Sequence, residues 1–148
     1  MKHVQFSVEG DGIATLTLDN ADESMNVVND DFLADMETVT QMVTAEERIK
    51  GVILRSAKRA FMAGADLKQL VASYGVMTRR DAYEFSQRAT RMHRAIERSG
   101  KPWVAVLNGV ALGGGFELAL ACRYRVVVDE PGARVGLPEV NVGLLPGS

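Results

Sequence analysis

The stretch Asn108-Gly109-Val110-Ala111-Leu112-Gly113-Gly114-Gly115-Phe116-Glu117-Leu118-Ala119-Leu120-Ala121-Cys122 decides the fold. It follows the apolar run Trp103-Val104-Ala105-Val106-Leu107, which is typical of a buried strand. Asn108-Gly109 predicts a turn, and the three glycines open a helix with Glu117 in its first turn. A strand, a glycine-rich connection and a helix in this order indicate an α/β domain.

The alternation of strands and helices continues on both sides of this stretch. The pattern predicts a hairpin of residues 3–8 and 12–18, strands at 50–56 and 124–128, and helices at 67–73 and 79–99, with a further helix capped by Asn29 or Asp30. Such an alternation favours right-handed crossovers between parallel strands. The methionines at 36, 42 and 92 fall at helical spacing among apolar residues, so we expect them in the core.

Composition narrows the class of protein. The chain has 148 residues, 47% of them hydrophobic, which suits one globular domain. A net charge of −2 without a basic stripe argues against nucleic-acid binding, and no apolar stretch is long enough to span a membrane. A single cysteine excludes an intrachain disulfide, and His3 and His93 lack metal-ligand spacing, so we expect a soluble protein of the cytoplasm or an organelle matrix with no metal site.

Two glutamates interrupt apolar sequence behind glycines. Glu117 follows the triple glycine, and Glu139 ends Val135-Gly136-Leu137-Pro138-Glu139. The fixed φ of Pro138 makes the backbone before Glu139 rigid. The helix dipole favours a carboxylate at the position of Glu117, whereas burial opposes its charge. Two carboxylates beside bare backbone N–H groups are the parts needed for acid–base chemistry at a carbonyl. A solvent-facing Glu117, a loop acid at 139 and glycines that serve only packing remain open alternatives.

A second small-residue segment, Ala63-Gly64-Ala65-Asp66, follows another apolar strand. The N–H groups of Ala65 and Gly114 could together hold a thioester oxygen, although the segment could equally be an ordinary strand–helix connection. Lys58 and Arg59 could meet a phosphate-bearing ligand. Cys122 is better explained as a small buried apolar residue than as a nucleophile, because neither histidine has a context that suggests a partner for it.

Three ordered motifs carry a resemblance that covers essentially the whole chain: Phe61-Met62-Ala63-Gly64-Ala65-Asp66-Leu67, Asn108–Ala119, and Gly136-Leu137-Pro138-Glu139-Val140 continuing to Pro146-Gly147-Ser148. They resemble the crotonase (enoyl-CoA hydratase/isomerase) superfamily, most of all the hydratase domain at the start of multifunctional fatty-acid oxidation subunits. The resemblance implies an α/β fold, the ClpP/crotonase spiral of ββα units.

The resemblance also implies site residues. Backbone N–H groups of Ala65 and Gly114 would form an oxyanion hole for the thioester carbonyl of an enoyl-CoA. Glu117 would activate the water that attacks the β-carbon, and Glu139 would deliver a proton to the α-carbon. Ala63, Gly64, Asp66 and Gly113 would contact the substrate. The implied activity is hydration of 2-enoyl-CoA in fatty-acid β-oxidation, with isomerisation using the same enolate.

The family pattern implies more sequence than is present. Residues 1–148 would be the core part of a hydratase domain, cut before the helical region that closes the pocket and builds a trimer-type oligomer. The domain would need no cofactor, with CoA belonging to the substrate, and NAD would bind only a downstream dehydrogenase domain. In a longer parent protein the partner would be a thiolase subunit of a fatty-acid oxidation complex. Another crotonase reaction, and a non-catalytic acyl-CoA-binding or assembly module, remain alternatives.

Overall fold

Five strands form the main sheet in the computed structural model, which describes residues 1–147 without the side chains of residues 67 and 70. They are β1 (Val4–Val8), β2 (Ile13–Leu18), β3 (Gly51–Ser56), β4 (Trp103–Leu107) and β6 (Tyr124–Val127), in the order β1-β2-β3-β4-β6. Strand β1 is antiparallel to β2 and the other pairs are parallel. The strands predicted from the apolar pattern are therefore confirmed.

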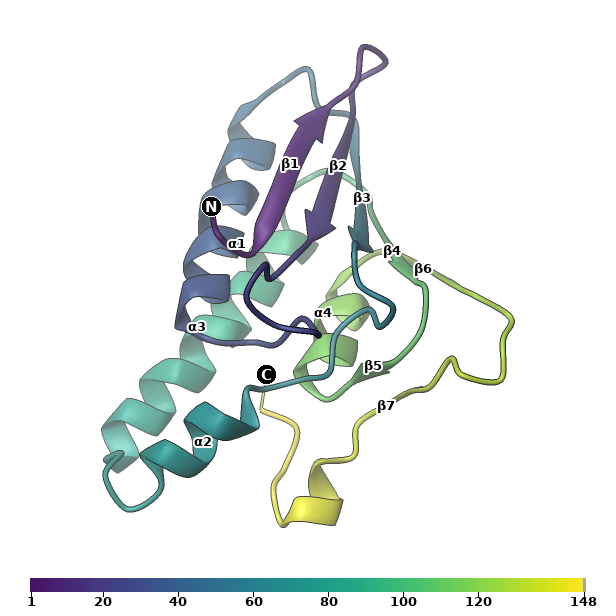
Figure 1. Ribbon diagram of the computed structural model, residues 1–148. Coiled ribbons are helices and arrows are strands. Elements are labelled where there is room, and N and C mark those ends of the chain that lie inside the picture. The colour runs from purple at the N-terminus through teal and green to yellow at the C-terminus, as the bar shows by residue number, and fades with distance from the viewer. Residues whose placement is uncertain (148) are drawn as a thin grey trace.

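Helices connect the parallel strands, as expected for crossovers (Figure 1). They are α1 (Asp30–Ala45), α2 (Leu67–Ser73), α3 (Arg79–Glu97), α4 (Gly114–Ala121) and the 3-10 helix η1 (Glu139–Val142). In Figure 1, α2 and the start of α3 extend away from the sheet. No helix within the described residues combines the length and apolar character required to cross a membrane.

A second row of short pairings runs beside the main sheet. It contains β5 (Ala111–Leu112) paired in parallel with β7 (Val135–Gly136), and two isolated bridges, Val28 with Ala65 and Met62 with Ala111. Each turn of the chain thus passes through the main sheet, then through this second row, and then into a helix. This is the spiral of strand–strand–helix units expected for the fold.

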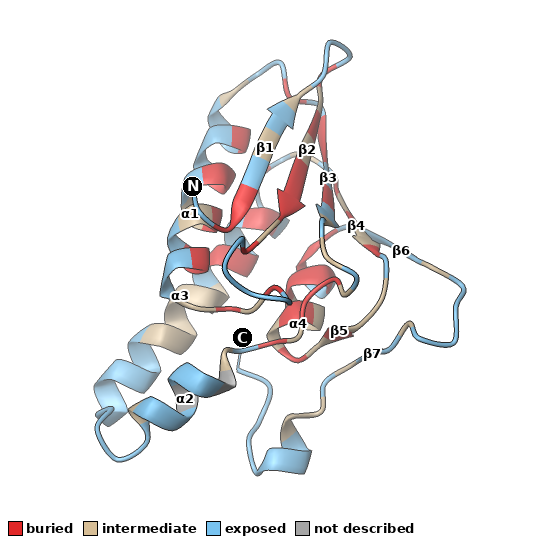
Figure 2. Cartoon of the chain, in the orientation of Figure 1, coloured by how far each residue is buried: buried red, intermediate tan, exposed pale blue. Residues whose placement is uncertain are grey.

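The core lies between the sheet and the helices (Figure 2). On α1 the inward face is apolar, with Phe32, Leu33, Met36, Val39 and Val43 buried. Met36 and Met92 are core residues as expected, but the expectation for Met42 is wrong, since 43% of its surface is exposed. Met42 precedes Val43, about 100° around the helix, which places it beyond the edge of the apolar stripe.

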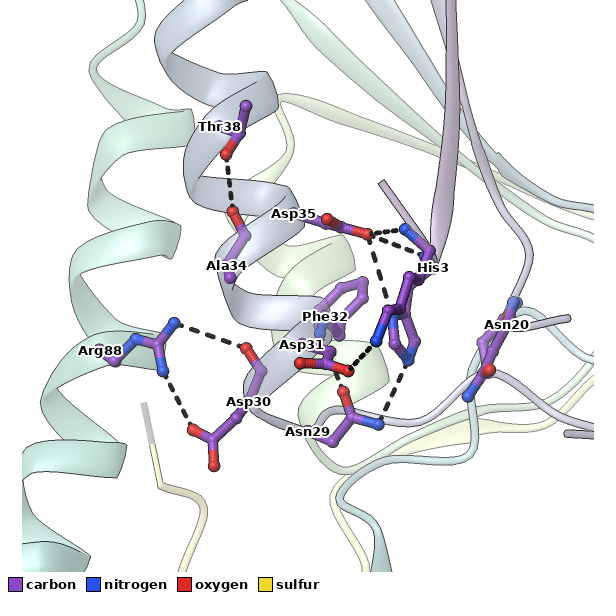
Figure 3. Close-up of polar contacts among 12 residues, drawn as sticks. His3, Asn20, Asn29, Asp30, Asp31, Phe32, Ala34, Asp35, Thr38 and Arg88 are labelled. Carbon is purple, nitrogen blue, oxygen red and sulfur yellow. Dashed lines mark hydrogen bonds and ion pairs between the residues drawn. The ribbon is translucent and has the colours of Figure 1, made fainter. Parts of the chain in front are cut away.

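Polar contacts fix the start of α1, at the point where the chain leaves the second row (Figure 3). Asn29 is the N-cap, and its Oδ1 accepts a hydrogen bond from Phe32 N at 2.8 Å. Arg88 of α3 donates to Asp30 at 3.0 Å and to Glu37 at 3.0 Å, so α1 and α3 are joined side by side. The carboxylate of Glu37 raises the pKa of the Arg88 guanidinium.

Candidate active site

The second row brings together the three segments that the sequence singled out, which contain Ala65, Gly113–Gly115 and Glu139. Leu112 N donates to Met62 O at 3.1 Å, which sets the glycine-rich start of α4 against the segment containing Ala65. Gly113 N donates to Gly136 O at 3.0 Å, which brings the chain before Glu139 to the other side of the same glycines. These segments are more than 20 residues apart in sequence. They meet because each one follows a strand of the main sheet and forms the short pairings of the second row.

Ala65 forms an isolated bridge of this row, and Gly114 follows the neighbouring strand β5 after one residue. Val28 N donates to Gly64 O and Asp66 N donates to Val28 O, so the bridge to Val28 uses the groups on either side of Ala65 N. Gly114 is the first residue of α4, where a backbone N–H has no partner within its helix. A β-carbon on Gly64 would lie 3.7 Å from Gly114 N, which shows how closely the segments approach. Within residues 1–147, no backbone oxygen accepts from either amide.

Each of the three glycines before Glu117 has a different reason to be glycine. Gly113 has φ +51°, and a β-carbon there would lie 2.7 Å from Glu139 Oε1. A β-carbon on Gly115 would lie 2.6 Å from Met62 O, so this residue lets α4 pack against the preceding turn. A β-carbon on Gly114 would be close only to the side chain of Val28, with Cγ2 at 3.3 Å. Packing and site geometry are thus both served by the same triplet.

Glu117 lies in the first turn of α4, and its own N–H donates to Gly113 O at 2.9 Å. Its Oε2 lies 3.7 Å from the position of a β-carbon on Gly114. The side chain is half-buried and contributes to the wall of a cavity. The alternative of a fully solvent-facing Glu117 is therefore excluded.

Glu139 is the first residue of η1 and follows Pro138, which is the N-cap. Its carboxylate is directed back toward the start of α4, because Oε1 lies against Gly113. Its Oε2 is buried and has no hydrogen-bond partner among the described residues. Buried carboxylate oxygens normally have a partner, and an exception requires an explanation such as a catalytic role.

One cavity of about 360 Å³ is lined by both glutamates and by Ala65 and Gly114. Its remaining wall is mainly apolar and comes from the chain before α1, the connection between α2 and α3, α3 itself and the last described residues: Val28, Met77, Phe85, Ala89, Met92, Leu144 and Leu145. Ser86 Oγ donates to Gly147 O at 2.6 Å, which holds the last described residues against α3. A mainly apolar cavity with a few convergent polar groups at one place is typical of a small-molecule site.

The other expected substrate contacts fall into two groups. Asp66 lines the cavity, and its Oδ1 also accepts from Lys68 N at 2.9 Å as the N-cap of α2. Ala63, Gly64 and Gly113 are not among the described residues that line the cavity, and their backbone groups pair with Asn26, Val28 and Gly136. Their expected roles in binding stay predictions, as do those of the glutamates and amides.

Charged residues outside the cavity are engaged elsewhere. Lys58 Nζ lies 2.9 Å from Asp19 Oδ1, and both side chains are largely buried. Lys68 pairs with Glu23 at 3.4 Å, and Arg80 with Glu84 at 2.8 Å, on the surface. Binding of a phosphate by Lys58 or Arg59 stays untested. The last residue of the third sequence motif, Ser148, lies outside the described residues.

Two residues of structural interest gave little signal in the sequence. Asn26 is buried, and its amide joins three strands or loops, donating to Ser56 Oγ at 2.9 Å and Phe61 O at 3.1 Å and accepting from Asn20 N at 3.0 Å. His93 is buried in α3 and lines the cavity. An asparagine or histidine in a polar context has no periodic signature, so only the tertiary structure identifies these positions.

The architecture and the cavity at the second row define a crotonase-type α/β protein. The chain belongs to the enoyl-CoA hydratase/isomerase family, whose model matches residues 9–148. Its relatives include the fatty acid oxidation complex subunit alpha of Idiomarina loihiensis, 38% identical over 99% of this chain, and that of Shewanella halifaxensis, 43% identical over 93%. The chain spans 20% and 19% of the length of these curated relatives, respectively.

Solved structures show the same fold. An enoyl-CoA hydratase from Geobacillus kaustophilus superposes with a TM-score of 0.90 at 31% identity, and the match covers 99% of this chain and 53% of that one. The enoyl-CoA hydratase from Bacillus anthracis gives a TM-score of 0.86 at 27% identity, covering 98% of this chain and 54% of that one. The described residues thus correspond to about half of each of those chains.

Proposed function

We propose that this chain is the catalytic core of an enoyl-CoA hydratase, which adds water to a trans-2-enoyl-CoA and yields a 3-hydroxyacyl-CoA. The observation that carries the proposal is that the side chains of Glu117 and Glu139 and the amides of Ala65 and Gly114 line one cavity. Membership of the hydratase/isomerase family and the names of the relatives support it.

The thioester oxygen accepts hydrogen bonds from the amides of Ala65 and Gly114. Addition to the conjugated double bond moves negative charge onto this oxygen, and fixed N–H donors stabilise that charge as it develops. Loss of one such donor raises the barrier by roughly 3–4 kcal/mol. The small side chain at Ala65 and the bare backbone at Gly114 let the oxygen approach both donors.

Glu117 takes a proton from water as the water oxygen bonds to the β-carbon, and Glu139 gives a proton to the α-carbon. Return of the proton from Glu117 to Glu139 through solvent restores both carboxyl groups, so the net change is addition of one water, with no electron acceptor required. The helix N-terminus favours the charged carboxylate at Glu117. Glu139 has a buried Oε2 without a partner in the described part of the chain, which suits an atom that exchanges a proton with a substrate.

The acyl chain occupies the apolar part of the cavity, between α3 and the segment containing Leu144 and Leu145. Isomerisation between 3-enoyl and 2-enoyl esters uses the same oxyanion donors and accompanies hydration. The relatives are subunits of a fatty acid oxidation complex, and we place this reaction in fatty-acid oxidation, with a complex of that kind as the assembly.

The test is to incubate the purified protein with crotonyl-CoA and follow the loss of enoyl-thioester absorbance, with identification of 3-hydroxybutyryl-CoA as product. Turnover supports the hydratase. Binding of crotonyl-CoA without turnover would replace it by a non-catalytic acyl-CoA-binding module. Absence of both binding and turnover would overturn the proposal altogether.

A further inference from the structure

The face of α3 that lines the cavity carries two polar side chains that the hydratase mechanism does not use, Ser86 and His93. Phe85, Ala89 and Met92 recur at helical spacing along this face, and His93 continues it one turn after Ala89. Phe85, Ala89 and Met92 are apolar, as expected for a wall against an acyl chain. An imidazole at this position therefore adds hydrogen-bonding capacity to a mainly apolar surface.

His93 makes no hydrogen bond to another described residue, unlike Asp30 and Ser86 of the same wall. Its residue exposure is 9%, and its ring nitrogens are not among the buried atoms without a partner, which in the described residues are His3 Nδ1 and Glu139 Oε2, so solvent still reaches the imidazole. Asp30 accepts from Arg88, and Ser86 donates to Gly147 O. A ligand that displaces water from the imidazole loses affinity unless it supplies a hydrogen bond in place of that water. Because His93 lines the cavity, a ligand there can supply that hydrogen bond.

The imidazole is neutral at physiological pH. Burial lowers the pKa of His93 to about 4, and the nearby Glu97 carboxylate opposes this shift only in part. A neutral imidazole presents one N–H donor and one nitrogen acceptor. Such a pair matches a hydroxyl, which both donates and accepts, or a carbonyl, which accepts. A carboxylate would favour a protonated ring, against the effect of burial, and is a poorer match.

We propose that His93 is a specificity-determining residue that favours enoyl-CoA esters whose acyl chain carries a hydroxyl or carbonyl group beyond the double bond. The proposal rests on the proposed function, because it assigns the acyl chain to this cavity. It concerns recognition of the chain, and the reacting carbons stay with Glu117 and Glu139. An unsubstituted acyl chain leaves the imidazole without a partner and is bound less favourably.

The experiment compares enoyl-CoA esters of one chain length, either unsubstituted or with a single hydroxyl or carbonyl at successive carbons. The measured quantity is the ratio of kcat/KM for the best substituted ester to kcat/KM for the unsubstituted one. In His93→Leu this ratio is expected to fall at least about 10-fold. His93→Gln retains a donor and an acceptor and should restore part of the ratio. Met92→Leu, a neighbouring change in the same wall, should alter both esters by the same factor.

Binding measurements separate this proposal from the proposed function. Calorimetry with the saturated, non-reacting esters reports recognition without turnover. If no enoyl ester is turned over but substituted esters bind more tightly to the unmutated protein than to His93→Leu, the hydratase fails and the role of His93 stands. The contrary outcome is that crotonyl-CoA is hydrated but neither the kcat/KM ratio nor the corresponding ratio of binding affinities changes by more than about 2-fold in His93→Leu and His93→Gln. That outcome overturns the role of His93. If His93→Leu does not fold, the comparison with His93→Gln decides between these outcomes.

Discussion

The Oε1 atom of Glu139 lies 2.7 Å from the point that a β-carbon on Gly113 would occupy. The carboxylate from one turn of the spiral therefore fits against bare backbone from the turn before it. This contact makes the position of Glu139 depend on the absence of a side chain at 113, and it leads to the first prediction.

Gly113→Ala should displace the Glu139 carboxylate and also strain the backbone, which has φ +51° at this residue. We expect kcat for crotonyl-CoA to fall at least about 100-fold. The matched control is Gly132→Ala, where a β-carbon would meet nothing within 4 Å and φ is not in the left-handed region, so activity should stay within about 2-fold. Equal activity of the two variants would show that the contact between Gly113 and the Glu139 carboxylate is not needed for activity.

Glu139→Gln keeps the shape of the side chain but removes its ability to give up a proton. If Glu139 protonates the α-carbon, kcat should fall at least about 100-fold while binding of a saturated acyl-CoA changes little. Steady-state kinetics together with calorimetry measure the two quantities. Near-normal turnover would remove Glu139 from the chemistry.

Asn26→Ala should destabilise the fold rather than alter the reaction directly. The amide of Asn26 joins Leu18, Ser56 and Phe61, so truncation leaves several buried polar groups without a partner. We expect the free energy of unfolding to fall by about 3 kcal/mol, measured by urea denaturation. A loss below about 1 kcal/mol would mean that solvent replaces the amide.

The burial of His93 predicts a pH-dependent stability. Its pKa is about 4 in the folded protein, below the ordinary value of 6.5, so the unfolded chain binds more protons between these values. The corresponding stability is present above pH 6.5 and is lost as pH falls toward 4. The advantage of the unmutated protein over His93→Leu should shrink by on the order of 3 kcal/mol across this window. Denaturation curves at several pH values test this, and a pH-independent difference between the two proteins would contradict it.

Cys122 should resist thiol reagents in the native protein. The side chain is 3% exposed, and burial raises the pKa of its thiol to about 12. Labelling at pH 8 is expected to be at least about 1,000-fold slower than for an exposed cysteine, because the thiolate is the reactive form. Unfolding in guanidinium should restore the ordinary rate, which serves as the control. Rapid labelling without denaturant would show that the pocket around Cys122 opens.

The parts of the fold with strong periodic patterns could be predicted from the sequence. Alternation located β1 and β2, and helical spacing located α1 and α3. The glycine triplet located the start of α4. The isolated bridges of Val28 and Met62 could not be predicted, because single-residue pairings leave no pattern. They depend on how successive turns stack, which is a property of the tertiary structure.

The candidate site was predictable to the extent that its residues sit in unusual local sequence. Glu117 and Glu139 stood out as carboxylates in apolar segments, and the structure places both on one cavity. His93 did not stand out, because the sequence gave it no metal-ligand spacing and its helix is rich in charged residues. Its significance comes from the cavity it faces, which is built by five separate segments of the chain.

The main sheet has the strand order β1-β2-β3-β4-β6, so every strand after the first pairs with the strand of this sheet that precedes it in the chain. On the ribosome, each emerging strand finds its docking edge already formed, and the nascent polypeptide can fold from its amino terminus as it is synthesised. Glu139 belongs to the last described helix, η1. The segment that carries Glu139 is therefore synthesised after the strands and helices that form the rest of the cavity wall.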